Sequence, residues 1–72
     1  MHSDKYVRIS GLTIGDDSAS GLAFSCDIDG ETVWVPYSQC RSREINSKVK
    51  GEDAIVVTAW WAGKKELEGE PI

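Results

Sequence analysis

The sequence predicts a mainly β protein: a small five-stranded antiparallel barrel, SH3-like or OB-like, with a short C-terminal helix. Three observations predict this fold class. Residues 22–28 alternate apolar with small or polar side chains, Asp29-Gly30 is a strong hairpin-turn signal, and residues 54–58 form a β-branched run. Short strands separated by turn residues are typical of small barrels.

The first strand is expected within residues 5–14. Val7 and Ile9 share one face by the two-residue period, whereas the next two apolar side chains fall on the opposite parity. A bulge or bend at Ser10-Gly11 would return all four to the core, since glycine is the usual residue at such a site. The alternative is two short strands with a kink between them.

The second and third strands are expected to pair through a two-residue turn at Asp29-Gly30. A type I′ turn fixes the register of the strands that it joins. This register pairs Ile28 with Glu31, Cys26 with Val33 and Phe24 with Val35 on the core face, and Asp27 with Thr32 and Ser25 with Trp34 on the other face. Trp34 is therefore expected to face away from the core, either covered by the C-terminal segment or open to a partner.

The second half of the chain is expected to hold two more strands. Pro36 lacks an N–H and ends the third strand, and residues 37–40 read as a short turn or one helical turn. Residues 41–49 alternate as a polar edge strand protected by Lys and Arg. Residues 54–58 predict a strand that is largely buried.

The last element is expected to be a short helix within residues 59–70, with Thr58 as its N-cap. Trp60 and Leu67 share one helical face, which predicts Trp60 in the core. Trp61 is ambiguous, because the competing interpretation extends the preceding strand through it.

Length and composition indicate a single domain, 1–72, with 1–4 and 69–72 expected to be flexible. The net charge of −4 disfavours nonspecific binding to duplex DNA or to anionic membranes. The N-terminus has no apolar h-region and no apolar run is long enough to span a bilayer, so neither a secretory signal nor a membrane partner is expected. One local exception to the acidity is residues 41–50, with four cations and one acid.

The sequence predicts no catalytic site, metal site or cofactor, and therefore no enzyme. The single histidine, His2, lies in the tail, and the chain has no zinc-ligand spacing and no phosphate-binding loop. Cys26 and Cys40 are expected to be reduced thiols, as in a cytoplasmic protein. A Cys26–Cys40 disulfide in a periplasmic protein is the alternative.

Two stretches, "DGETVWVPYSQ" and "IVVTAWWAGKKEL", resemble a group of short phage-borne proteins of unassigned function. The positions that carry the resemblance are Asp29, Gly30, Val33 to Pro36, Ser38, Gln39, Trp60, Ala62, Lys64, Lys65 and Leu67. The resemblance implies a phage or prophage origin, hence the host-cell cytoplasm, a small β-barrel and no known enzymatic activity. It implies no particular ligand.

These observations favour a non-enzymatic binding module that engages or inhibits another protein. Exposed Trp and Arg are characteristic of interaction hot spots. One alternative is a single-stranded nucleic acid binder, because bases stack on aromatics along a cationic groove; another is a homo-oligomeric structural protein, such as a homodimer. The candidate binding residues are Trp34, Thr32, Arg41, Arg43, Lys48, Lys50 and Trp61.

Overall fold

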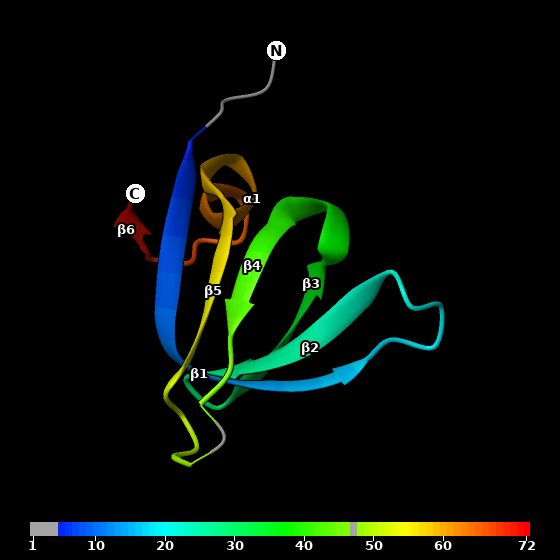
Figure 1. Cartoon of the computed structure of the whole chain (residues 1–72). Helices are drawn as coiled ribbons and strands as arrows, with labels where there is room; N and C mark the ends of the chain where they lie inside the picture. Colours follow the sequence, from blue (N-terminus) through cyan, green and yellow to red (C-terminus); the bar gives the residue numbers. More distant parts are fainter. Residues whose placement is uncertain (1–4, 47) are drawn as a thin grey trace.

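The protein is mainly β and antiparallel, as predicted. A computed structural model describes residues 5–46 and 48–72. Within them the elements are β1 (Tyr6–Asp17), β2 (Ala23–Ile28), β3 (Glu31–Pro36), the 3-10 turn η1 (Tyr37–Gln39), β4 (Cys40–Glu44), β5 (Asp53–Thr58), α1 (Ala59–Lys64) and β6 (Glu70–Pro71). The strand order is β3-β2-β1-β5-β4, with β6 beside β1 (Figure 1). The sheet is not closed, because β3 and β4 form its two ends, so the predicted barrel is confirmed only as an open antiparallel sheet with one short helix.

β1 is bent and serves both halves of the sheet. Its first part pairs with β5 and its second part with β2, and Figure 1 shows it curving from one half into the other. The register shifts between Ser10 and Leu12, where Gly11 has a φ of 73°. A side chain is strained at that φ, so glycine permits the bulge that keeps Ile9 and Leu12 both buried. The predicted bulge is confirmed.

A buried carboxylate, Asp53, holds this bend. It is 5% exposed at the start of β5. Its Oδ2 accepts a hydrogen bond from the Ile14 backbone N–H at 2.8 Å, and its Oδ1 accepts one from the Asn46 backbone N–H at 2.6 Å. Because a buried charge without partners is costly, these two bonds make Asp53 the tie between β1 and the β4–β5 loop.

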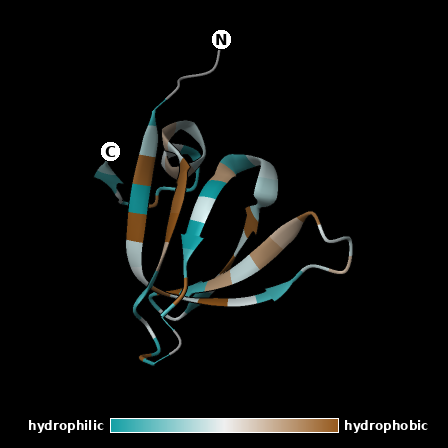
Figure 2. Ribbon diagram, in the orientation of Figure 1, coloured by the Kyte–Doolittle hydropathy of each residue, from teal (hydrophilic) through white to brown (hydrophobic). Residues whose placement is uncertain are grey.

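The β2–β3 hairpin has the predicted register at every pair. Its turn residues, Asp29 and Gly30, have φ values of 53° and 81°, as a type I′ turn requires. Leu22 differs from the prediction: it is 73% exposed and precedes β2, so it does not belong to the core face of the strand. Figure 2 shows hydrophobic and hydrophilic residues alternating along β1, whereas β4 is mostly hydrophilic.

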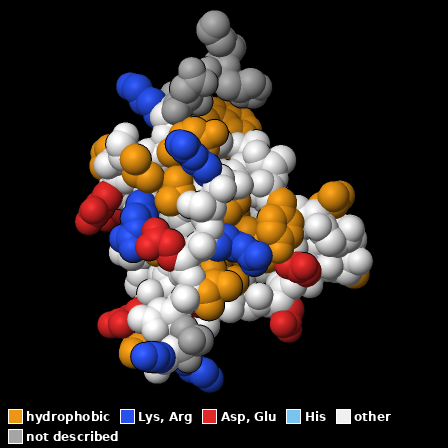
Figure 3. Space-filling model, in the orientation of Figure 1, with side chains coloured by type: hydrophobic (Ala, Val, Ile, Leu, Met, Phe, Trp, Pro, Cys, Tyr) orange, Lys and Arg blue, Asp and Glu red, His pale blue; other side chains and the backbone are white. Residues whose placement is uncertain are grey.

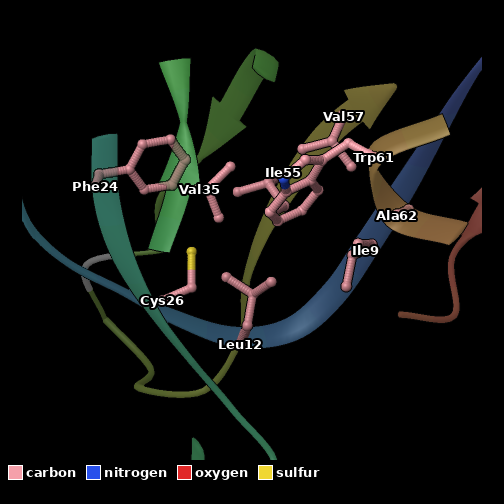
Figure 4. Close-up of a cluster of buried hydrophobic side chains, with 9 residues drawn as sticks. All are labelled: Ile9, Leu12, Phe24, Cys26, Val35, Ile55, Val57, Trp61 and Ala62. Atoms are coloured by element: carbon pink, nitrogen blue, oxygen red, sulfur yellow. The ribbon is translucent and has the colours of Figure 1, made fainter. Parts of the chain in front are cut away.

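The core joins both halves of the sheet to α1. Phe24 and Val35 lie together at one end of the cluster in Figure 4, and Trp61 lies beside Ile55 and Val57 at the other. Every side chain drawn there is at most 4% exposed.

The prediction that Trp60 lies in the core is wrong, and Trp61, which the sequence leaves ambiguous, is the buried ring. Thr58 does cap α1, because its Oγ1 accepts a hydrogen bond from the Trp61 backbone N–H at 3.2 Å. In the helix that begins after this cap, Trp61 and Ala62 are the buried residues and belong to the core cluster. Trp60 therefore faces solvent and is 54% exposed.

Two further segments differ from the prediction. β4 ends at Glu44 instead of continuing to residue 49, because the Asn46 N–H is taken by Asp53 and the chain leaves the sheet. The C-terminal residues 70–71, expected to be flexible, pair as β6 with Val7 and Arg8 of β1. The predicted flexible residues 1–4, with His2, and the predicted strand residue Ser47 lie outside the described residues.

Replacing Asp53 by Asn keeps the shape of the side chain but turns one acceptor into a donor that faces a backbone N–H. We expect D53N to lower the free energy of unfolding by about 2 kcal/mol, measured by urea denaturation monitored by circular dichroism. D16N, at an exposed acid of β1, is the control and should match the wild type. A D53N variant as stable as D16N would contradict the role of this carboxylate.

Candidate functional site

The outer face of β1, β2 and β3 carries an exposed tryptophan among small polar side chains. Trp34 is 51% exposed on β3 and lies opposite Ser25 of β2. Ser25 in turn adjoins Gly15 of β1, where even a methyl group would collide with the Ser25 hydroxyl. We call this surface the Trp34 face; its members are Thr13, Gly15, Ser25, Asp27, Thr32 and Trp34.

Trp34, Ser25 and Gly15 lie side by side across β3, β2 and β1. The large indole ring therefore stands next to two residues with little or no side chain. A ring of this size with open sheet beside it can pack against a partner side chain on its face and its edge. The position follows from the hairpin register, since Val33 and Val35 point the other way into the core. The C-terminal segment pairs with β1 at Val7 and Arg8, and Trp34 keeps half of its surface open.

The Trp34 face is acidic. Its one charged member is Asp27, which is exposed and faces Thr32 across the hairpin. The nearby turn adds Asp29 and Glu31, both exposed. The surface therefore combines an aromatic ring, hydroxyl groups and carboxylates.

The predicted cations are not gathered around Trp34. Arg41 lies over the Tyr6 ring at 5.2 Å, and Arg43 lies over Phe24 at 5.0 Å. Lys48 and Lys50 are exposed in the β4–β5 loop. Figure 3 shows Lys and Arg side chains among hydrophobic ones on one side of the molecule. The structure thus places the two arginines over other rings, whereas Thr32 and Trp34 share one face of β3.

Arg43 has a structural role at the unpaired side of the sheet. It pairs with Ile55 of β5 and reaches both Phe24 and the Tyr37 ring, the latter at 5.3 Å. The Tyr37 hydroxyl donates a hydrogen bond to Asp17, which raises the pKa of that tyrosine. Cation–π contacts of this kind stabilise the packing of the rings, so Arg43 covers these two aromatic side chains.

Trp61, a predicted binding residue, is 4% exposed and belongs to the core. The exposed helix tryptophan is Trp60, whose ring lies 5.0 Å from the Lys64 ammonium group. Lys64 follows Trp60 by one helical turn, and this spacing is the sequence signal that Trp60 lies on the outward face of the helix.

The two thiols are free and neither is activated. Burial raises the pKa of Cys26 to about 11, with a smaller contribution from Cys40. Burial also raises the pKa of Cys40, whose thiol donates to the Ser42 carbonyl at 3.3 Å. A raised pKa lowers the thiolate fraction and the reactivity of a cysteine, so these thiols act as packing groups.

In the described ranges, 5–46 and 48–72, no three metal-ligating side chains gather into a site for an ion. No helix there combines the length and the apolar character needed to cross a membrane. Comparison of the chain with protein-family models, with curated proteins and with solved structures found no match.

The thiols give a direct check of the core. A pKa of about 11 instead of the ordinary 9.0 leaves Cys26 with about a hundredfold less thiolate at pH 8. We expect iodoacetamide to label the half-buried Cys40 before Cys26 in the native protein, as read by peptide mass spectrometry. In strong denaturant the two should react alike. Faster labelling of Cys26 in the native state would contradict the packing of β2.

Proposed function

We propose that the chain is a non-enzymatic module that binds another protein through the Trp34 face. The observation that carries the proposal is the half-exposed Trp34 ring on a regular sheet surface. Tryptophans of this kind anchor protein interfaces, where a few large side chains supply most of the binding energy. A small sheet with a well-packed core offers a rigid platform for such an anchor.

The charges support a protein partner over a nucleic acid. A single-strand binder needs aromatic rings and cations along one groove, whereas Arg41 and Arg43 contact other rings and Trp34 shares its face of the sheet with Asp27. Lys48 and Lys50 lie in the β4–β5 loop. The nucleic acid alternative therefore has less support than protein binding.

The proposal includes the origin of the target protein and the cell compartment. The resemblance to short phage-borne proteins would make the target a host or phage protein that the module engages or inhibits in the host-cell cytoplasm. The free thiols of Cys26 and Cys40 agree with a reducing compartment. An SH3-like or OB-like arrangement of the strands, with β3 and β4 left unpaired, remains part of the proposal.

The chain contains a matched control for Trp34, because Trp60 is exposed to the same extent on a different element. Wild type, W34A and W60A, each immobilised through the N-terminus, would capture partners from a lysate of the bacterial host. We expect W34A alone to lose the partner. With the purified partner, W34A should weaken Kd by about 2 kcal/mol, or roughly thirtyfold, and W60A should leave it unchanged.

Equal retention by W34A and the wild type would contradict the proposal. Addition of a single-stranded oligonucleotide at low and at moderate salt tests the alternative by tryptophan fluorescence. Quenching that weakens with salt and disappears in W34A would favour nucleic acid binding instead.

A further inference from the structure

We infer that the partner docks as an extended basic strand along the free edge of β3, with its cationic side chains over the Trp34 face. This inference rests on the proposed function, and it adds the mode of docking and the chemistry of the partner segment.

The backbone of β3 has free hydrogen-bonding groups at Thr32 and Trp34. A two-residue turn makes Ile28 and Glu31 a hydrogen-bonded pair, and such pairs alternate with non-hydrogen-bonded ones along an antiparallel ladder. The Tyr37 N–H donates to the Leu22 carbonyl at 3.0 Å, which fixes the same alternation at the other end of the hairpin. The N–H and C=O groups of Thr32 and Trp34 therefore point away from β2.

This edge lacks the protection that the opposite edge has. β4 carries a register shift at Arg41 and three charged side chains in five residues, both of which hinder pairing with another strand. β3 pairs with β2 without any shift and has no Lys or Arg. Its only blocking residues are Glu31 and Pro36 at its two ends, so residues 32–35 are open to an added strand.

The chemistry of the face defines the partner. Alternate residues of an added strand lie on one face of the sheet, about 7 Å apart. A residue opposite Trp34 adjoins the indole ring, where a cation is attracted by the π-system. A residue opposite Thr32 can reach over that short side chain to the Asp27 carboxylate. The best-matched segment therefore has two basic residues separated by one residue.

The net charge of the chain also favours a basic partner segment at the β3 edge. The chain carries −4 overall, and the turn beside this edge contributes Asp29 and Glu31. A second copy of the chain would bring equal negative charge and the same acidic turn to the interface. A basic segment of another protein is the occupant that the charges favour.

The test uses the full-length protein labelled with 15N. The probe is a capped β-branched peptide with arginines at two positions separated by one residue, and its control carries glutamates there. We expect the arginine peptide to shift the Thr32 and Trp34 amide signals and to slow their hydrogen exchange, and the glutamate peptide to leave both unchanged.

Two changes remove the backbone bonds without removing Trp34. T32P deletes an N–H that β2 does not use, and Pro is tolerated at such an edge position. N-methylation of the peptide amide that faces Trp34 removes one N–H donor from the peptide and leaves the protein unaltered. Each should weaken binding about tenfold, the effect of one lost hydrogen bond of about 1.4 kcal/mol.

Binding that tolerates both changes would overturn the docking mode. Absence of binding by the arginine peptide, with W34A still abolishing capture of a partner, would overturn this inference and leave the proposed function standing. Concentration-dependent dimerisation in sedimentation, abolished by T32P, would also overturn it, because a second copy would then occupy the edge.

Discussion

The rest of the structure depends on the bend of β1, and the bend depends on the buried carboxylate of Asp53. Where β1 leaves β5 to join β2, its backbone needs a hydrogen-bond acceptor that the ladder no longer supplies. Asp53 accepts from Ile14 and, with its second oxygen, from Asn46. One side chain thus holds the point where the two halves of the sheet meet and takes the Asn46 N–H where β4 has ended. β3 and β4 are the unpaired edges of the sheet.

The two edges have different surroundings. Arg43 of β4 extends over Phe24 and Tyr37 and covers the core on that side. β3 presents a regular backbone edge and an exposed indole ring on an acidic face. The sheet therefore has one edge, β4, with a register shift and charged side chains, and one regular edge, β3, which carries Trp34. This difference is the physical basis for placing the partner at β3.

Local patterns in the sequence predict the hairpin correctly, because an Asp-Gly turn and a two-residue period act over adjacent residues. The bulge at Gly11 is predictable for the same reason. The tryptophans of α1 are not, since two adjacent apolar rings in a six-residue helix give no clear period, and packing against the rest of the core determines which ring is buried. The sequence groups the basic segment with Trp34 as candidate binding residues, but it cannot place them in space, because long-range contacts with Tyr6, Phe24 and Tyr37 hold the two arginines of this segment.

Amide hydrogen exchange of the free protein, resolved by residue, tests the accessible edge of β3 most directly. The account predicts an alternating pattern, with Val33 and Val35 protected by β2 and with Thr32 and Trp34 exchanging rapidly, because their N–H groups face the open edge. Uniform protection from Thr32 to Val35 would contradict the account, since it would mean that β3 is paired on both sides in the free protein.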